Sequence, residues 1–231
     1  MENFTRTINL MGEDKFLKLA KSRVAVFGIG GVGGYVCEGL ARCGIGEITI
    51  VDYDNVSESN INRQIIATYK TIGKSKTDIM KQRILDINPN ARVVDLQINI
   101  NKNNINEFDF SKYDFVVDAI DTVTSKILLI EKAKKQNANV ISCMGTGNKF
   151  DCTKLKIDDI AKTSMCPLAK VMRKELKDRN IKNVPVLYSL EQPVKQGGSG
   201  ERKVTPNSIV FVPSVAGLMI AQYVIYKIME K

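Results

Sequence analysis

A glycine-rich motif, VAVFGIGGVGG, begins at Val24 and joins a short apolar run to closely spaced glycines. Gly28, Gly30 and Gly33 fit the pattern G-x-G-x-x-G between a predicted strand and a predicted helix. Glycines at these positions allow a tight turn and let the backbone approach a phosphate at the helix N-terminus. The motif therefore predicts a nucleotide-binding loop, in preference to a turn that serves packing alone.

A polar cluster follows the glycines and changes the chemistry that they suggest. Asp52 ends the next predicted strand, where a carboxylate can bind ribose hydroxyls, as in an NAD-dependent dehydrogenase. The chain then adds Asp54, Asn60, Arg63, Gln64 and Lys76. A dehydrogenase has no need of cations beside the phosphates. When a carboxylate attacks the α-phosphorus of ATP, however, Arg63 and Lys76 can stabilise the charge on the phosphate and the departing pyrophosphate. The cluster therefore favours adenylation of a carboxylate.

Two further carboxylates occur in the sequence VVDAID, at the end of another predicted strand. Open α/β sheets bind ligands at the carboxyl ends of their strands, so Asp118 and Asp121 are candidates to hold Mg²⁺ or to contact the nucleotide. An alternative role for Asp118 is to cap the segment that follows it or to orient the glycine loop. Because the chain contains no histidine, Ser-His-Asp and Cys-His catalysis and histidine-ligated metal sites are excluded.

The elements that must position these residues alternate between strand and helix. Because such alternation implies βαβ units, we predict a Rossmann-like, doubly wound α/β fold with a mostly parallel sheet. The expected strands are 24–27, 48–51, 93–98, 115–118 and 140–143, and the expected helices are 13–21, 32–42, 76–87 and 125–135.

The pattern changes after Cys143, where we expect an antiparallel C-terminal extension of the same single domain, residues 1–231. The expected elements are an edge strand at 154–157, an amphipathic helix at 167–179, short strands at 186–188 and 209–211, and a largely buried helix at 215–228. In the amphipathic helix, Leu168, Val171, Met172 and Leu176 form the predicted apolar stripe, with basic residues off it. The segment QGGSGERK, residues 196–203, has the composition of a flexible loop.

Charge and cysteine content point to a cytoplasmic protein with an anionic partner. The net charge is +9, and residues 149–203 carry thirteen Lys/Arg against seven Asp/Glu. We therefore expect a basic, flexible elaboration at about 149–205 that suits a polyanion such as RNA, although a basic solvated face is an equal alternative. The five cysteines include no CxxC pair, which argues against a disulfide framework and a zinc site. No apolar run approaches the roughly 20 residues of a membrane span.

The order of these motifs resembles the ubiquitin-activating-enzyme superfamily, whose bacterial members include ThiF and MoeB. The matching residues are Arg6, Gly28–Gly33, Asp52 and Asp54, Ser59–Gln64, Lys76, and Asp118 with Asp121, within about residues 4–147. The resemblance implies that Gly31 contacts the nucleotide, Asp52 the ribose, and Asn60, Arg63 and Lys76 the phosphates. It also implies that Asp121 holds Mg²⁺, and that Arg6 enters the active site of a neighbouring subunit in a homodimer.

The rest of the chain resembles one branch of this superfamily, the TcdA-type tRNA threonylcarbamoyladenosine dehydratases. The resemblance lies in DAIDTVTSK (118–126), in residues 144–169 and in the basic helix that follows. It implies that ATP adenylates the threonyl carboxylate of a modified adenosine in tRNA. The neighbouring carbamoyl group then attacks intramolecularly and closes a ring. A sulfur-relay or cysteine-desulfurase-associated protein is an additional partner that this resemblance leaves open.

Two other functions stay open at this point. The first is adenylation of the C-terminus of a ubiquitin-like sulfur-carrier protein, against which the missing CxxC pairs and the basic charge argue. The second is a non-catalytic nucleotide-binding scaffold, against which the complete set of Arg, Lys and Asp residues argues. Cys37, Cys43 and Cys143 are expected to be packing residues. Cys166 has thioester formation as a less favoured alternative role.

Overall fold

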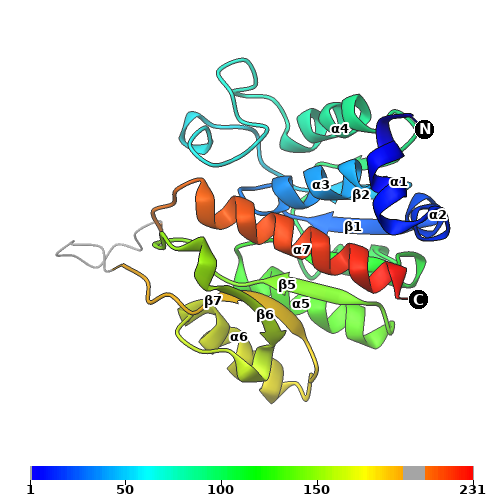
Figure 1. The fold of residues 1–231 in the computed structure, drawn as a ribbon. Coiled ribbons are helices and arrows are strands. Elements are labelled where there is room, and N and C mark those ends of the chain that lie inside the picture. Colours follow the sequence, from blue (N-terminus) through cyan, green and yellow to red (C-terminus); the bar gives the residue numbers. More distant parts are fainter. Residues whose placement is uncertain (1, 195–205, 231) are drawn as a thin grey trace.

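A single seven-stranded sheet organises the protein, in a computed structural model that describes residues 2–194 and 206–230 (Figure 1). The strand order is β3-β2-β1-β4-β5-β7-β6, and every pair is parallel except β6 with β7. The strands are β1 (Arg23–Phe27), β2 (Glu47–Val51), β3 (Arg92–Leu96), β4 (Phe115–Asp118), β5 (Val140–Cys143), β6 (Leu155–Asp159) and β7 (Pro185–Ser189). The predicted doubly wound fold with an antiparallel extension is confirmed.

Helices cover both faces of the sheet, because its central strands are apolar on both sides. In β1, Val24 and Val26 pack into the cluster that holds α3 and α7, while Ala25 and Phe27 pack on the opposite face with Leu129 of α5. The α-helices are α1 (Thr5–Met11), α2 (Glu13–Lys21), α3 (Gly33–Arg42), α4 (Lys76–Ile87), α5 (Val123–Lys135), α6 (Pro167–Asp178) and α7 (Phe211–Met229). Short 3-10 helices are η1 (Glu2–Phe4), η2 (Glu58–Asn60), η3 (Ile105–Glu107), η4 (Phe110–Lys112), η5 (Cys152–Lys154) and η6 (Ile160–Lys162).

The C-terminal extension has a small core of its own. Met172 and Leu176 of α6 pack against Val186 and Tyr188 of β7, and β6 forms the predicted antiparallel edge. The predicted apolar stripe of α6 is wrong at Val171, whose side chain is exposed. The predicted flexible loop at 196–203 lies outside the described residues.

The remaining errors of prediction concern helix ends and short apolar runs. Residues 209–211 do not form the predicted strand. Residues 209 and 210 lie just before α7, and Phe211 is the first residue of that helix. Helix α7 therefore starts four residues earlier than predicted. It includes Pro213 in its first turn, where a missing N–H costs no helical bond. Helix α1 was not predicted, because none of its side chains is buried and its sequence has no apolar stripe. Strand β3 ends at Leu96, two residues early.

Helix α7 is the one helix in the described ranges that is long and apolar enough to cross a membrane by length and hydropathy. Half of its most apolar window is buried inside the protein, and the helix packs against α3 and against strands β4 and β5. The core helix of a water-soluble protein passes the same test of length and composition. Packing against α3 and the sheet accounts for its apolar sequence.

Candidate functional site

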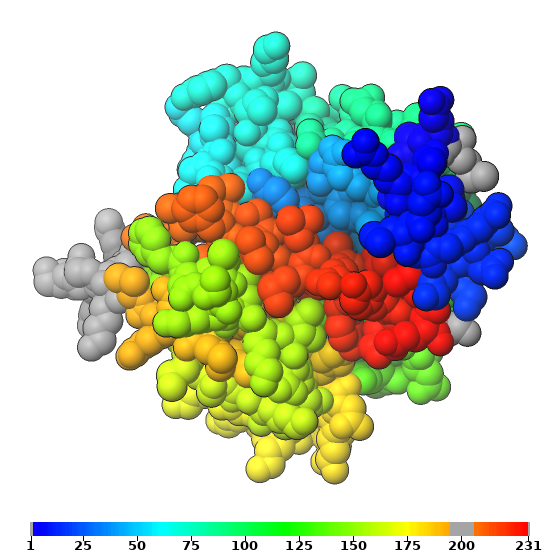
Figure 2. Space-filling model, in the orientation of Figure 1, coloured from blue at the N-terminus to red at the C-terminus, as the bar shows by residue number. Residues whose placement is uncertain are grey.

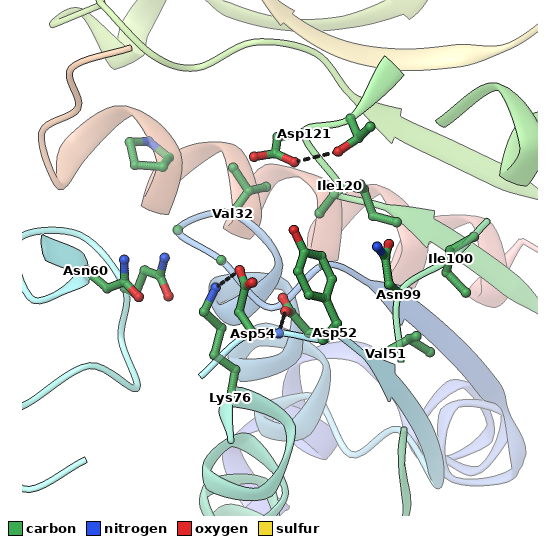
Figure 3. A pocket seen from close by; sticks show the side chains of 18 of the residues that line it. Val32, Val51, Asp52, Asp54, Asn60, Lys76, Asn99, Ile100, Ile120 and Asp121 are labelled. Atoms are coloured by element: carbon green, nitrogen blue, oxygen red, sulfur yellow. Dashed lines mark hydrogen bonds and ion pairs between the residues drawn. The ribbon is translucent and has the colours of Figure 1, made fainter. Parts of the chain in front are cut away.

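A cavity of about 300 Å³ opens at the carboxyl ends of β1, β2 and β4 (Figure 3). From β1 the chain continues to β2 and β3 on one side, and then crosses back to β4 on the other side of β1, so the sheet changes its winding direction here. Open α/β sheets bind ligands in the crevice at such a point. The cavity contains ten of the predicted site residues: Gly28, Gly30, Gly31, Asp52, Asp54, Asn60, Arg63, Gln64, Lys76 and Asp121.

The glycine loop wraps the start of α3 tightly against β4. Gly28 has a φ of +89°, and a Cβ there would lie 2.7 Å from the carbonyl oxygen of Ala119. A Cβ on Gly33 would lie 1.7 Å from the carbonyl oxygen of Gly28, so this glycine serves packing and does not line the cavity. Gly30 is different, because the nearest atom to its Cβ position is 3.9 Å away, on the side chain of Gln64. Its bare backbone faces open space where a phosphate can approach.

Asp52 ties the glycine loop to β2. One carboxylate oxygen accepts the backbone N–H of Ile29 at 2.6 Å, and the other accepts that of Asp54 at 2.9 Å. A carboxylate oxygen has a second lone pair, so Asp52 can hold the loop and still accept a hydroxyl from a ligand. The predicted ribose contact is therefore compatible with its bonds.

Lys76 is the first residue of α4, and its side chain is buried beside the cavity. Its Nζ donates to Oδ2 of Asp54 at 2.7 Å, and its backbone N–H donates to the carbonyl of Asp54 at 3.1 Å. In Figure 3 this pair lies across the cavity from Asp121. Asp54 thus holds both the ammonium group and the backbone of Lys76, by one bond each.

The crossover segment after β2 supplies Arg63. Its Nη1 donates to the carbonyl of Ser59 and to Oδ1 of Asn62, both at 2.8 Å. Asn62 in turn donates to the carbonyl of Ser208 at 3.0 Å, which joins this segment to the start of α7. Ser59 itself does not line the cavity, and its part here is the carbonyl that holds Arg63.

The amides of Asn60 and Gln64 close this side of the cavity. Asn60 is buried, and its Oδ1 accepts the backbone N–H of Ser57, so its side chain is fixed. Gln64 is buried as well, and its Oε1 is the one buried side-chain polar atom without a partner in the described part of the chain. An orphaned buried acceptor costs free energy until a donor reaches it. Because Oε1 is itself buried, a ligand reaches it only after the Gln64 side chain moves.

Asp118 and Asp121 have separate roles. Asp118 is fully buried, and its Oδ2 accepts Nζ of Lys126 at 2.9 Å and the hydroxyl of Ser142. Its Oδ1 accepts the backbone N–H of Ile120 at 3.2 Å. Asp118 is not among the residues that line the cavity, which disagrees with its predicted contact with the nucleotide, and its bond to Ile120 agrees with the alternative role of capping the segment that follows it. Asp121, at the end of that turn, does line the cavity.

Three carboxylates of the cavity lie close enough to Tyr53 to affect its hydroxyl. The charge of Asp54 raises the pKa of the Tyr53 hydroxyl, with burial, Asp121 and Asp52 as further causes. A phenol responds in this way because its ionised form is repelled by neighbouring negative charge. The cavity thus holds three carboxylates and two cations, Lys76 and Arg63, so one additional positive charge would balance these five groups.

Arg6 and Cys166 lie outside this cavity. Arg6 belongs to α1, which lies near the amino-terminal end of β1 (Figure 1). Cys166 is buried under α6 with its Sγ 4.0 Å from the carbonyl oxygen of Gly145. Burial also raises the pKa of the Cys143 thiol to about 12, as expected of a core cysteine. The cysteines therefore take no visible part in the site.

Several residues of the cavity were missed by sequence reasoning. Tyr53, Asn99 and Ile100 follow the carboxyl ends of β2 and β3, so the rule that found Asp52 and Asp121 could have found them. Ser208 and Pro213 come from the distant segment before and within α7. No motif marks them, and only the packing of α7 on α3 brings them to the site.

Comparison with known proteins shows the family of the chain. Residues 4–231 match the sequence model of the ThiF family. The chain belongs to the ThiF family. Within it, the tRNA threonylcarbamoyladenosine dehydratase of Bacillus subtilis is 39% identical over 243 aligned residues, which cover 100% of this chain and 96% of that protein. The dehydratase of Escherichia coli K12 is 38% identical over 76% of this chain and 66% of its own length.

Solved structures with a similar fold include two from Escherichia coli. The chain is similar to Escherichia coli TcdA, a tRNA N6-threonylcarbamoyladenosine dehydratase solved in complex with ATP, with a TM-score of 0.92 and 32% identity over 99% of this chain and 94% of that one. Escherichia coli MccB with ATP has a TM-score of 0.70 at 20% identity, over 100% of this chain and 64% of that one, and shows the shared fold alone.

Proposed function

We propose that this ThiF-family protein uses ATP to dehydrate N6-threonylcarbamoyladenosine in tRNA, by adenylating the threonyl carboxylate. The observation that carries the proposal is the cavity itself. It sets Lys76 and Arg63 beside a bare glycine loop, in a chain that matches nearly the full length of a dehydratase so named. Binding of ATP is supported by the complex of the TcdA relative.

In the proposed reaction, a threonyl carboxylate oxygen attacks the α-phosphorus, and the bond from that phosphorus to the bridging oxygen of pyrophosphate breaks. The glycine loop holds the phosphates by backbone N–H groups, while Lys76 and Arg63 stabilise the charge that develops on them. A carbamoyl nitrogen or oxygen then attacks the acyl carbon, AMP leaves, and the net change is loss of one water. The second step is intramolecular and needs positioning more than a strong base.

The residues of the cavity also fit Mg²⁺. This ion is usually held by one or two carboxylates together with substrate phosphates, and it keeps several waters. Asp121 lines the cavity, and among the described residues only the Thr122 hydroxyl donates to its carboxylate, at 3.2 Å. In the described ranges, no three Asp, Glu, Cys or His side chains are placed so that they could hold a metal ion together, so the phosphates would complete the coordination. When bound, the ion would neutralise phosphate charge during adenylation.

A homodimer would complete the site with Arg6. Helix α1 carries this residue on a surface next to an apolar groove of about 380 Å³, lined by Leu10, Leu218 and Tyr226 among others. Leu10 is 88% exposed, and leaving such a side chain in water is unfavourable by roughly 1.5–3 kcal/mol. A second copy that covers the groove would bury these side chains and bring α1 toward a neighbouring cavity. The arginine would then add a third cation to the phosphates.

The setting proposed for this reaction is the cytoplasm, where tRNA is modified. The five cysteines are free thiols, as a reducing compartment requires. A sulfur-relay or cysteine-desulfurase-associated partner stays a prediction, as do the alternatives of carrier-protein adenylation and a non-catalytic scaffold.

Mass spectrometry of nucleosides tests the proposal directly. Purified protein is incubated with ATP and tRNA that carries threonylcarbamoyladenosine, and the tRNA is then digested to nucleosides. We expect a modified adenosine lighter by one water, formed only with ATP present and reduced by about 10²–10³-fold in Lys76→Ala and Arg63→Ala. An unchanged nucleoside would refute the activity. Release of pyrophosphate with a Gly-Gly-ended carrier protein, and not with tRNA, would favour the carrier alternative.

A further inference from the structure

A rigid loop after β5 borders the candidate site. Within it, the backbone N–H of Asn148 donates to the carbonyl of Asn207 at 2.7 Å, and the N–H of Asn207 donates back to Oδ1 of Asn148 at 2.8 Å. Gly147 packs so closely that a Cβ would lie 2.6 Å from Cβ of Pro206. Ser208, the residue that follows Asn207, lines the cavity. The loop is therefore attached to the wall of the site.

Phe150 projects from this loop on a backbone that is fixed at both sides. The carboxylate of Glu191 accepts the backbone N–H groups of Phe150 at 3.0 Å and of Asp151 at 2.9 Å. The preceding residue, Lys149, is buried and donates to the carbonyl of Gly145 at 2.7 Å. In spite of these constraints, the Phe150 side chain is 66% exposed. Its exposure is thus set by the fold and not by a loose backbone.

Phe150 is one of three exposed apolar residues on hydrogen-bonded segments of this region. Leu190 and Val194 are also exposed, and they flank Glu191, which holds the backbone of Phe150. Hydrogen bonds to Lys154 and Asn148 join their segment to the loop. Figure 2 shows the segment around residue 150 next to the start of α7. Contiguous exposed apolar side chains mark a surface that binds something.

The charge of the surroundings favours an anionic partner over a membrane interior or an apolar peptide. Between Lys149 and Val194 the chain has ten Lys/Arg and six Asp/Glu, a net charge of +4. An exposed aromatic ring on a protein with an excess of positive charge is suited to bind unstacked nucleotides, because every base has a π-face and every linkage a negative charge.

We propose that Phe150 is a stacking platform for a base that neighbours the reacting adenosine; this inference rests on the proposed function. To bring its threonyl carboxylate to the α-phosphate, the modified adenosine must leave the stack of its loop, which exposes the faces of its neighbours. The two residues from Asn148 to Phe150 span at most about 7 Å. A ring at this place meets a neighbouring base while the target lies in the cavity.

A pair of substitutions at Phe150 separates stacking from apolar burial. Phe150→Leu keeps an apolar side chain without a ring, whereas Phe150→Trp keeps a π-face. We expect Phe150→Leu to weaken binding of the modified tRNA by roughly 5- to 150-fold, the range found when a base loses one aromatic partner, and Phe150→Trp to bind within about 3-fold of wild type. The affinity for ATP, measured by calorimetry without tRNA, should be unchanged in both.

Tyr69 provides a matched control, because it is also an exposed aromatic residue, 77% exposed, on a different segment. Tyr69→Leu should leave the affinity for tRNA unchanged. Wild-type affinity in Phe150→Leu, or an equal loss in Tyr69→Leu, would overturn the role of Phe150 while the dehydratase activity of the wild-type protein stood. If wild-type protein neither binds nor dehydrates the tRNA, the proposed function fails and this inference fails with it.

Discussion

Substitution of Lys126 by methionine should destabilise the protein far more than its single lost ion pair suggests. Lys126 and Asp118 are both fully buried, with Nζ 2.9 Å from Oδ2, and Lys126 also donates to the hydroxyl of Ser142 at 3.2 Å. Methionine keeps the length and apolar character of the side chain but removes the ammonium group. The carboxylate of Asp118 is then left buried without its counter-ion.

The expected loss follows from that uncompensated charge. Removing one partner of a buried pair typically costs about 3–5 kcal/mol of the free energy of unfolding. For a chain of this size, 1 kcal/mol shifts Tm by about 2–4 °C, so we expect Tm to fall by roughly 6–20 °C. The variant should also lose dehydratase activity below its Tm, because Asp118 holds the N–H of Ile120 and thereby the turn that carries Asp121.

Thermal and urea unfolding measure this effect, and Lys135→Met on the same helix is the control. Lys135 pairs with Glu131 at 3.1 Å on the surface, and loss of such a pair should cost no more than about 1 kcal/mol. The double variant Asp118→Leu/Lys126→Met should recover part of the lost stability, because a buried pair can be replaced by apolar side chains. If Lys126→Met and Lys135→Met shifted Tm equally, the reasoning about the buried pair would be refuted.

Three further predictions concern the glycine loop, the apolar groove and the response to acid. Gly33→Ala should unfold the loop and lower Tm, whereas Gly30→Ala should keep Tm and weaken ATP binding; equal Tm values would contradict the assigned contacts. Leu10→Asp should convert the proposed dimer to a monomer in light scattering, and a dimer that persists would move the interface elsewhere. Burial raises the pKa of Glu38, but the hydrogen bonds from Arg83 and Arg42 outweigh this effect and lower the pKa below its ordinary value. The ionised Glu38 therefore stabilises the fold above the ordinary pKa of 4.5, and this stabilisation is lost as the pH falls through the lowered pKa. Over that pH range, the urea midpoint of Glu38→Gln should vary less than that of the wild-type protein.

The elements of the fold could be predicted wherever burial is periodic. β1 and β2 are apolar on both faces, and α4 has the predicted ends because Asn88-Pro89 stops it. Prediction failed where burial is absent or depends on distant packing. α1 buries none of its own side chains, and Val171 lies at a helical position typical of a core residue but has no neighbour to cover it.

The site could be predicted in its residues but not in all of their roles. The sequence VVDAID offers two acids at one strand end, and nothing in it shows which of them faces the ligand. The register of β4 decides the question, because Asp118 pairs with Phe27 inside the sheet and finds Lys126 and Ser142 as buried partners. Lys126 comes eight residues later on a helix, so the ion pair depends on the way α5 folds back over β4. Asp121, three residues after Asp118, is the acid that lines the cavity.

The described site is already arranged for an anion before one binds. An ammonium group has three donors, so Lys76 can keep its bond to Asp54 and donate to a phosphate at the same time. Arg63 uses only Nη1 for Ser59 and Asn62, which leaves its other nitrogens for the ligand. Neither cation has to give up a protein partner, and so little reorganisation is needed when charge develops on the phosphates. Gln64 is the exception, since its buried Oε1 lacks a donor and is closed to a ligand until its side chain moves.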